Sequence, residues 1–429
     1  MTRLAAVTGE ASGDLIAAQA LGPLVRQGVA LEGIGGPALA ALGMDCWFSS
    51  DRLAVRGYVE ALARLPDILS VRRALLRRLC HTPPDVFLGV DAPDFNLGVE
   101  RRLRAQGVTT VHLVSPSIWA WRPERIRTIE SAVDHMLCLF PFELDCYRQT
   151  RVHAVFVGHP LADLVPLQPQ PQEARAQLQS LGLMLGADRP VLAVLPGSRR
   201  SEIDAVGPPF LEAAMTLAKE FQPVIPAVSS PVAAQIRALP GWPAAEAAGV
   251  QMVVAAAAAA SRPVSHLVLE ASTLALVASG TATLEAAMFR RPMVIGYRIP
   301  ALSYWWMRRK AVVHRIGLPN LLCQEDLVPE YLQERCTAAH LVQAVRDWTA
   351  DPARMNAVAE RFGALHETLR RGCAQQVSEF LASLLASRAA CPRSLSLSVW
   401  AWMRWGVAPG RGPSARAPSY CILPAPLRG

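Results

Sequence analysis

The chain has 429 residues, of which 52% are hydrophobic and 18% are charged, and its formal net charge is +8. This length and apolar content predict two or three globular domains with large cores, and they exclude a disordered or fibrous protein. Residues 387–429 carry six arginines and no lysine or acidic residue, so they account for +6 of the +8. The rest of the chain is close to neutral, which argues against a basic groove for DNA or RNA.

The cysteines and histidines give no sign of a disulfide framework or a local metal site. Nine cysteines stand at irregular intervals without a C-x-x-C pair, and nine histidines include no H-E-x-x-H pattern. We therefore expect reduced, mostly buried thiols and no bound metal. The first apolar run, Leu4–Val7, is too short for a signal peptide, and no stretch has the composition of a membrane span, so we expect a cytoplasmic protein.

The first half of the chain repeats a strand, a turn and a helix. Apolar strand-like runs cover Leu4–Val7, Val29–Gly33, Val86–Val90 and Thr110–Val114. Each is followed by residues typical of a tight turn. This alternation predicts a doubly wound α/β domain with a parallel sheet. Asp91 directly follows one of the strands, where either a catalytic base or a helix-capping residue would be found.

An amphipathic helix is predicted between the second and third of these strands. Leucines and a tyrosine recur at helical spacing beside a cluster of arginines: Tyr58, Leu62, Leu65, Leu69, Leu76 and Leu79, with Arg72, Arg73, Arg77 and Arg78. A basic amphipathic helix can lie in an anionic membrane interface. A core helix with a solvated basic face would give the same pattern, so both interpretations stay open.

The second half contains two loops of the kind that bind phosphate. A buried strand from Val191 runs into Gly197-Ser198-Arg199, and the strand-like run Leu276–Ala278 runs into Ser279-Gly280-Thr281 at the start of a helix. Free backbone N–H groups and the positive end of the helix dipole favour an anion there. Glu285 lies one turn further on, where its carboxylate could accept hydrogen bonds from a ribose. Neither loop is a Walker A sequence, which argues against a kinase or NTPase.

A set of motifs in this order resembles the bacterial lipid-A-disaccharide synthase family over roughly residues 1–385. These motifs are Gly9–Asp14, Asp91–Asn96, Ser115–Arg122, Pro141–Glu143, Gly158–Pro160, Pro196–Arg199, Ser279–Glu285 and Leu318–Leu322. The resemblance implies a glycosyltransferase-B fold, in which two doubly wound Rossmann-like domains face a cleft. It also implies an inverting, metal-independent transfer of 2,3-diacylglucosamine from UDP to 2,3-diacylglucosamine 1-phosphate, which forms a β-1,6 bond and releases UDP.

The predicted organisation follows from this resemblance and from the Pro/Gln-rich stretch Pro166–Gln172. Residues 1–165 form the acceptor- and membrane-facing domain, residues 166–189 a linker, and residues 190–365 the UDP-sugar-binding domain. Residues 366–386 form a C-terminal helix. Residues 387–429 depart from the family pattern, and we expect a disordered tail there.

The resemblance also implies roles for particular residues. Asp91 becomes the preferred base on the acceptor hydroxyl, with Glu10 and Glu143 as competitors and Asp94 as a helix cap. The nucleotide site combines Gly197, Ser198, Arg199, Ser279, Gly280, Thr281, Glu285 and Asn320, of which Arg199 and Asn320 assist the departing group. Glu10, Ser117, Trp119, Tyr58, Leu62, Leu65 and Leu69 are expected to contact the acceptor or its acyl chains.

The expected partners are the two acylated substrates and an anionic membrane surface, which places the protein peripherally on the inner face of the bacterial inner membrane. No cofactor is expected, because the UDP-sugar is a substrate. The sequence leaves open whether two copies form a homodimer. Two other functions remain: a non-hydrolysing UDP-sugar epimerase and a non-catalytic nucleotide-sugar-binding protein. Only the transferase requires the acceptor for UDP release.

Overall fold

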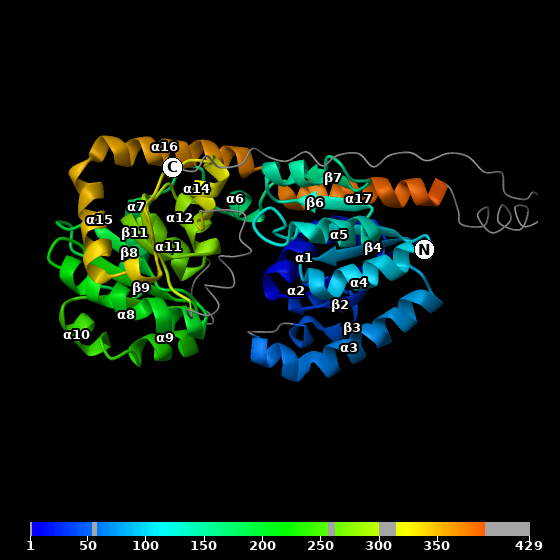
Figure 1. Ribbon diagram of the computed structural model, residues 1–429, viewed down its shortest axis with the longest axis horizontal. Helices are drawn as coiled ribbons and strands as arrows, with labels where there is room; N and C mark the ends of the chain where they lie inside the picture. The colour runs from blue at the N-terminus through cyan, green and yellow to red at the C-terminus, as the bar shows by residue number, and fades with distance from the viewer. Residues whose placement is uncertain (1, 54–57, 256–261, 300–314, 391–429) are drawn as a thin grey trace, which may run out of the picture. The chain divides into compact units, whose positions relative to one another are not determined.

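The computed structural model describes residues 2–53, 58–255, 262–299 and 315–390, without the side chains of residues 58–63 and 389–390. Its described strands form two sheets, and every strand pair is parallel (Figure 1). The first sheet has the order β3-β2-β1-β4-β5-β6-β7. Its strands are β1 (Arg3–Thr8), β2 (Ala30–Gly35), β3 (Asp45–Ser49), β4 (Val86–Val90), β5 (Thr109–Leu113), β6 (His135–Cys138) and β7 (His153–Phe156).

Both faces of the first sheet are covered by helices. Along β1, Leu4 and Ala6 face one core while Ala5 and Val7 face another, as the two-residue period of a strand requires. The helical segments of this half are α1 (Ala11–Arg26), α2 (Pro37–Ala41), η1 (Ser50–Arg52), α3 (Tyr58–His81), α4 (Pro93–Arg104), η2 (Pro123–Arg125), α5 (Ile126–Ala132), η3 (Pro141–Tyr147) and α6 (Pro160–Leu164). Helices α1 and α2 contribute to the first core, and α3 and α4 to the second.

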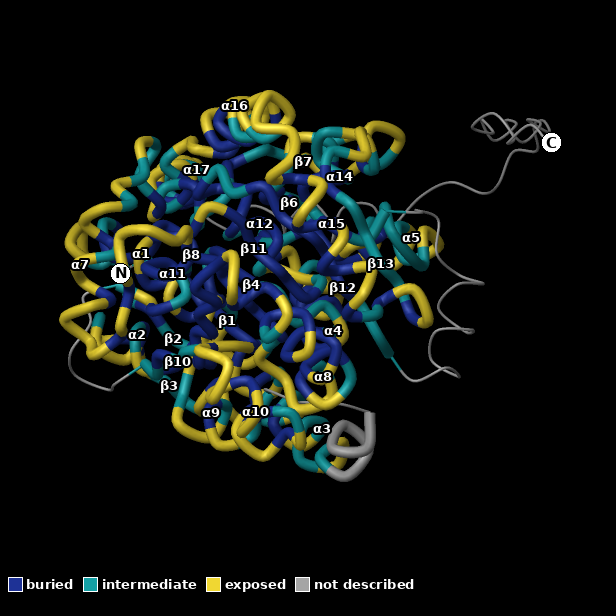
Figure 2. The backbone as a smooth tube through the Cα atoms, turned by 90° about the vertical axis from the view of Figure 1, so that its left-hand side faces the viewer, coloured by how far each residue is buried: buried dark blue, intermediate teal, exposed yellow. Residues whose placement is uncertain are grey.

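The second sheet repeats the arrangement of the first, with the order β10-β9-β8-β11-β12-β13. Its strands are β8 (Val191–Leu195), β9 (Gln222–Ala227), β10 (Gln251–Val254), β11 (Ser272–Ala278), β12 (Met293–Tyr297) and β13 (Glu330–Leu332). Its helical segments are α7 (Pro171–Ser180), α8 (Arg200–Leu217), α9 (Ser230–Arg237), α10 (Trp242–Ala247), α11 (Val264–Ala271), α12 (Thr281–Met288), α14 (Leu318–Cys323), η4 (Gln333–Arg335), α15 (Ala338–Ala350) and α16 (Pro352–Leu369). The central strands are buried, while the outer turns of the helices are exposed (Figure 2).

Two doubly wound Rossmann-like halves were predicted, and this part of the prediction is confirmed. The stretch between the two halves is partly helical, although it was expected to be a linker. Residues 171–180, inside the stretch expected as a linker, form α7, and its Ala174 and Leu178 are buried in the core of the second half. The expected C-terminal helix over residues 366–386 corresponds to the end of α16 and to α17 (Cys373–Ala390). The tail beyond residue 390 lies outside the described residues.

Helix α17 returns the chain to the first sheet. Its residues Cys373, Val377, Leu381 and Leu385 recur every four positions and are buried with Leu4 and Leu88 in one core. The Asp163 carboxylate, at the end of α6, accepts hydrogen bonds from the backbone N–H groups of Gly372 at 2.9 Å and Cys373 at 2.6 Å. These bonds satisfy donors at the start of α17, where a negative charge is favourable. Asp163 therefore fixes the point at which α17 begins.

Glycine is required where the chain passes this junction. Gly158 has a φ of 85°, and a Cβ there would lie 2.8 Å from the carbonyl oxygen of Leu369. The next residue, His159, donates its backbone N–H to the same carbonyl at 2.9 Å. The Gly158–Pro160 motif of the sequence is thus explained by backbone packing against the end of α16.

None of the helices within the described residues combines the length and the apolar character needed to cross a bilayer.

Replacing Leu381 by alanine tests the contribution of α17 to the first core. Leu381 is fully buried, so Leu381→Ala should lower the free energy of unfolding by about 2–5 kcal/mol. Urea unfolding followed by far-UV circular dichroism measures this loss. The matched control is Leu181→Ala, because Leu181 is 38% exposed and should tolerate the change. Equal stability of the two variants would mean that α17 does not complete this core.

Candidate active site

Three polar residues follow three neighbouring strands of the first sheet. Glu10 comes after β1, Asp91 after β4 and Ser115 after β5, and these strands are adjacent in the order β1-β4-β5. Because parallel strands end at the same edge, the three residues lie along one edge of the sheet. Such an edge is the usual ligand-binding position in an open α/β sheet.

The backbone at this edge has an unusual conformation. Asp91 and Ala92 have φ angles of 51° and 44°, and Val114, directly after β5, has a φ of 78°. Left-handed conformations are uncommon for residues other than glycine, and consecutive ones are costly. Backbone strain of this kind tends to occur at functional sites. The strain marks Asp91 as more than a simple turn residue.

The Asp91 carboxylate has no hydrogen bond or ion pair with any described residue, although its backbone N–H donates to the carbonyl of Leu113 at 2.9 Å. Asp94, which was expected to cap α4, is exposed in the first turn of this helix. Its carboxylate pairs with Arg125 and makes no capping hydrogen bond to α4. Glu10 is exposed at the N-terminus of α1, where it makes no side-chain capping bond. Of the two aspartates, Asp91 is the one whose carboxylate has no polar partner within the described part of the chain.

The Glu143 side chain forms hydrogen bonds within the turn in which it lies. Its carboxylate accepts hydrogen bonds from the backbone N–H groups of Leu139 at 3.1 Å and Phe140 at 3.0 Å, and its side chain is buried. Burial raises the pKa of Glu143 to about 7, against the lowering effect of these hydrogen bonds. This carboxyl therefore titrates near neutral pH, but it is used to hold the start of η3.

In the second sheet, the two phosphate-type loops follow the neighbouring strands β8 and β11. Gly197 has a φ of 108°, and a Cβ there would lie 2.8 Å from the Glu202 side chain. The Glu202 carboxylate accepts from the backbone N–H groups of Ser198 and Arg199, each at 3.3 Å. Glu202, which the sequence analysis did not single out, therefore fixes the loop. The Arg199 side chain is 73% exposed, with its guanidinium 3.6 Å from Glu202.

The second loop opens α12 without a side-chain cap. Gly280 is the N-cap residue with a φ of 127°, and Thr281 is exposed beside it. The first N–H groups of α12 are thus available to an anion. The Thr283 hydroxyl is instead buried, donating to the carbonyl of Gly280 at 2.8 Å and accepting from Leu318 N–H at 3.3 Å. Ser279 donates to the carbonyl of Ile316 at 3.4 Å.

Glu285 lies one turn into α12 and faces α11. Its carboxylate is 4.0 Å from Nε2 of His266, and burial raises the pKa of Glu285. Burial also lowers the pKa of His266 to about 4, so this imidazole is neutral at physiological pH. Sequence reasoning missed His266, because a lone histidine in an apolar helix carries no motif. Only its spatial position beside Glu285 identifies it.

Asn320 lies at the edge of a pocket of about 750 Å³. Its amide nitrogen donates to the carbonyl of Val328 and to the Glu330 carboxylate, each at 2.8 Å, and its oxygen accepts from Val328 N–H at 3.0 Å. All polar atoms of this buried side chain are therefore used within the protein. The pocket is lined by Trp119, Phe142, Arg315, Asn320, Leu321, Gln324, Asp326, Val328, Pro329, Glu330, Leu332 and Arg354.

Aromatic side chains from the first half contribute to this pocket. The Trp119 and Phe142 rings are in edge-to-face contact, with centroids 5.2 Å apart. Ser117 is exposed two residues before Trp119. The pocket thus combines apolar side chains with charged ones of both signs: Arg315, which pairs with Asp326 at 2.6 Å, Arg354 and Glu330.

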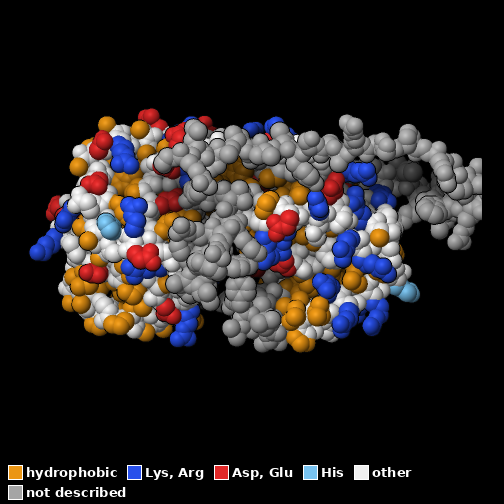
Figure 3. All heavy atoms as spheres, viewed as in Figure 1, with side chains coloured by type: hydrophobic (Ala, Val, Ile, Leu, Met, Phe, Trp, Pro, Cys, Tyr) orange, Lys and Arg blue, Asp and Glu red, His pale blue; other side chains and the backbone are white. Residues whose placement is uncertain are grey.

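The predicted amphipathic helix exists as α3, but its apolar residues divide into two sets. Val71, Leu75 and Leu79 are buried against the first sheet, so Leu79 follows the core interpretation that the sequence left open. Leu65 is 46% exposed and Leu69 is half-buried. The side chains of Tyr58 and Leu62 lie outside the described part of the chain. Figure 3 shows hydrophobic side chains and Lys/Arg side chains next to each other over α3.

Within the described residues, no three His, Cys, Asp or Glu side chains gather as a ligand set for a metal ion.

Comparisons with solved structures agree with the two-sheet architecture. Sucrose-phosphate synthase from Thermosynechococcus elongatus superposes with a TM-score of 0.54 at 15% identity, covering 90% of this chain and 100% of that one. MurG from Acinetobacter baumannii gives 0.51 at 13% identity, covering 89% and 100%. UDP-GlcNAc 2-epimerase from Neisseria meningitidis, solved with bound UDP-GlcNAc, gives 0.56 at 12% identity, covering 89% and 100%. These likenesses show a glycosyltransferase-B type fold.

Sequence relatives identify the family. The family model described as lipid-A-disaccharide synthetase matches residues 4–379. The lipid-A-disaccharide synthase of Verminephrobacter eiseniae is 47% identical over 395 residues, which cover 90% of this chain and 97% of the relative. That of Thiobacillus denitrificans is 46% identical over 384 residues, covering 88% and 99%. An epimerase or a non-catalytic binding protein is therefore not favoured. The chain belongs to the lipid-A-disaccharide synthase family of glycosyltransferases, which form the lipid A disaccharide by glycosyl transfer.

Proposed function

We propose that Asp91 is the general base of this transfer. The observation that carries this proposal is the Asp91 carboxylate, which has no polar partner among the described residues and lies on a strained turn at the end of β4. A base in this position would take the proton of the acceptor hydroxyl as its oxygen attacks the anomeric carbon of the donor sugar, while the bond to UDP breaks on the opposite face. Such an in-line displacement inverts the anomeric configuration. The exposed Glu10 remains the competing carboxylate.

We propose that UDP binds across the ends of β8 and β11. The backbone N–H groups of Gly280 and Thr281 would hold the diphosphate together with the exposed Arg199, and Glu285 would accept hydrogen bonds from the ribose hydroxyls. Ser198 belongs to the first loop, where its backbone N–H donates to Glu202. Ser279 and Gly197 shape the two loops. These donors can stabilise the negative charge of the departing UDP, so the proposed reaction needs no metal and no cofactor.

Asn320 would act by shaping the pocket, since its amide is bonded to Val328 and Glu330. We propose that the pocket beside it, with Trp119 and Phe142 on one side and Arg354 on another, accepts part of an acylated, phosphorylated substrate. Ser117 and Trp119 would then contact the sugar or an acyl chain of the acceptor.

We propose peripheral association with an anionic membrane, on the inner face of the bacterial inner membrane, through α3. The support for this is the exposed Leu65 near one end of the helix and the exposed Arg73, Arg77 and Arg78 towards the other. Since Leu75 and Leu79 anchor α3 to the sheet, the outward face can contact lipid without unfolding the domain. A homodimer remains part of the proposal and is tested by light scattering in detergent-free buffer.

Asp91→Asn tests the base. The amide keeps the shape of the side chain but cannot take a proton, so turnover should fall about 10²–10⁴-fold. UDP affinity, measured by calorimetry, should stay nearly unchanged, because Asp91 lies in the half opposite the UDP loops. UDP release is followed with both acylated substrates present and with the acceptor omitted. Glu10→Gln is the matched comparison. Turnover near that of the wild type in Asp91→Asn, with a collapse in Glu10→Gln, would transfer the role to Glu10.

Glu285 should make UDP binding depend on pH. Its pKa is raised above the ordinary value of 4.5, and only the ionised form accepts two ribose hydroxyl bonds well, so UDP affinity should rise as the pH increases through this raised pKa. Glu285→Gln should remove this component, which separates it from titration of UDP itself. Arg199→Ala is the control: it should weaken binding at every pH and keep the pH dependence. Identical pH profiles for wild type and Glu285→Gln would contradict the ribose assignment.

The triple variant Leu62→Ser, Leu65→Ser, Leu69→Ser tests the membrane face. It should bind vesicles containing phosphatidylglycerol more weakly and raise the KM for acylated acceptor, because each lost leucine removes about 1.5–3 kcal/mol of apolar burial in the interface. UDP affinity should not change. Wild-type vesicle binding should also weaken with salt, since exposed charges are screened beyond about 8–10 Å.

The control for this experiment is Leu181→Ser, an exposed leucine on the second half. It should leave vesicle binding intact. A folded triple variant with unchanged vesicle binding and unchanged KM would rule out α3 as the docking face.

A further inference from the structure

We propose that Asn96, supported by the buried Glu100–His112 pair, is a positioning residue that holds the Asp91 turn in its left-handed conformation for sugar transfer. This inference rests on the proposed role of Asp91 and names the residues through which the fold would set its position.

Asn96 connects the turn to two strands. It lies in the first turns of α4 and is fully buried. Its amide nitrogen donates to the carbonyl of Asp91 at 2.8 Å and lies 3.5 Å from the carbonyl of Val90 and 3.4 Å from that of Val7. These carbonyls belong to the turn, to the end of β4 and to β1. A single side chain therefore gathers the carbonyl groups that surround the turn.

The turn needs this support because little else favours its shape. Both Asp91 and Ala92 are left-handed, and neither is a glycine. On the other side, Ala92 is pressed against Gly9, where an added Cβ would overlap the Cβ of Ala92. The turn is thus fixed between the backbone of Gly9 and the amide of Asn96, and a change on either side should move Asp91.

Glu100 and His112 form a second polar layer next to Asn96. Glu100 follows Asn96 by one helical turn, and its Oε1 is 2.7 Å from Nδ1 of His112 on β5, with both side chains fully buried. Gly89 on β4 leaves the room: a Cβ there would overlap Glu100 Oε1 and lie 3.1 Å from the Cβ of Asn96.

Two neighbouring polar side chains of α4 thus lie within a helix–sheet contact that is otherwise apolar, with Phe95, Val99 and Leu103 in the same core as Phe87. Buried polar pairs are poor sources of stability, but they specify one arrangement. Here the Glu100–His112 pair would fix the position of α4 on β4 and β5. That position determines where the Asn96 side chain contacts the turn.

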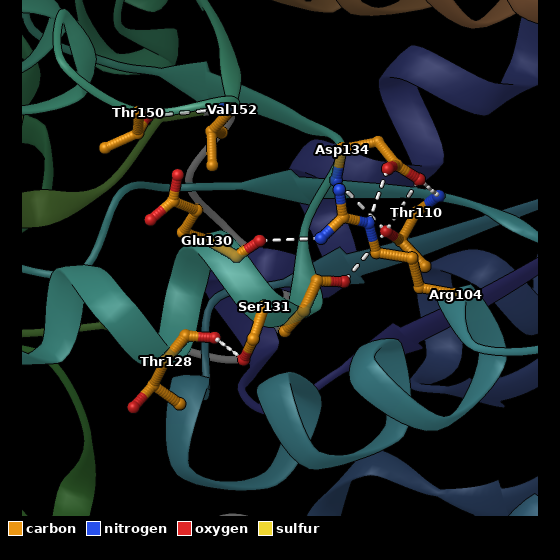
Figure 4. A network of polar contacts seen from close by, with 9 residues as sticks. Arg104, Thr110, Thr128, Glu130, Ser131, Asp134, Thr150 and Val152 are labelled. Atoms are coloured by element: carbon orange, nitrogen blue, oxygen red, sulfur yellow. Dashed lines mark hydrogen bonds and ion pairs between the residues drawn. The ribbon is translucent and has the colours of Figure 1, made fainter. Parts of the chain in front are cut away.

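The test compares Asn96→Leu with Gly9→Ala and with a control, Thr110→Val. Leucine fills the space of Asn96 without a donor, and the alanine at position 9 pushes the same turn from the other side. Thr110 is equally buried but lies at the opposite end of β5, where its hydroxyl donates to the carbonyl of Ala132 at 2.9 Å and contacts Asp134 (Figure 4). Its loss should cost stability without moving the turn.

We expect Asn96→Leu and Gly9→Ala to lower kcat by up to about 100-fold, the effect of misplacing a reacting group by about 1 Å, with UDP affinity unchanged. Thr110→Val should keep kcat. Each variant is then combined with Asp91→Asn. If Asn96 acts through Asp91, the double variant should be no slower than Asp91→Asn alone.

Glu100→Leu should lower kcat in the same way, and Glu100→Gln should restore it, because the glutamine oxygen can still pair with His112. A Glu100→Leu enzyme with wild-type kcat would remove the pair from the proposal.

The outcomes separate this inference from the proposed function. Full activity of Asp91→Asn would overturn both. A large Asp91→Asn effect, with independent, multiplying losses in the Asn96 and Gly9 double variants, would overturn only the positioning role. Unchanged kcat in folded Asn96→Leu would do the same. If Asn96→Leu does not fold, the kcat values of Gly9→Ala and of Gly9→Ala combined with Asp91→Asn decide the question.

Discussion

The conformation of two residues, Asp91 and Ala92, governs the arrangement of the first half. Pro93 begins α4 immediately after them and disfavours a right-handed helical conformation at Ala92, so the chain must reverse within a very short distance. It does so in the left-handed region, which is accessible there because Gly9 has no side chain. The position of α4, and with it the buried groups between α4 and the sheet, depends on this reversal.

The six strands of the second sheet have the same order as the first six of the first sheet, but the loops proposed to face the ligands are built differently in the two halves. In the two phosphate-type loops that follow β8 and β11, positive φ angles fall on Gly197 and Gly280, which adopt them at little cost. In the turns that follow β4 and β5, they fall on Asp91, Ala92 and Val114, for which they are strained. A diphosphate can be bound by backbone alone, whereas proton transfer needs a side chain held in a defined place. The distribution of glycine and strain matches this division.

Much of the fold could be predicted from the sequence, and so could the loops that we propose form the site. The apolar strands and the Gly/Ser loops are local patterns, and the parallel order follows from their alternation with helices. What could not be predicted depends on contacts between distant residues. Glu202 and His266 belong to no recognised motif, and the Asp91–Asn96 motif does not reveal what the Asn96 side chain contacts. Their contacts with the Ser198–Arg199 loop, with Glu285 and with the Asp91 carbonyl appear only in the folded chain. The sequence left open whether Leu79 faces a membrane or the core, because the helical period does not say which apolar stripe of α3 faces the sheet.

The return of α17 to the first sheet has a consequence for biosynthesis. The residues that complete one face of that sheet lie more than 200 positions after it, as the 210-residue separation between Asp163 and Cys373 illustrates. During translation the ribosome delivers the whole second half before Leu381 and Leu385 can pack. Until then, part of the apolar surface of the nascent first half remains exposed to solvent. Chaperones would be needed most at this stage.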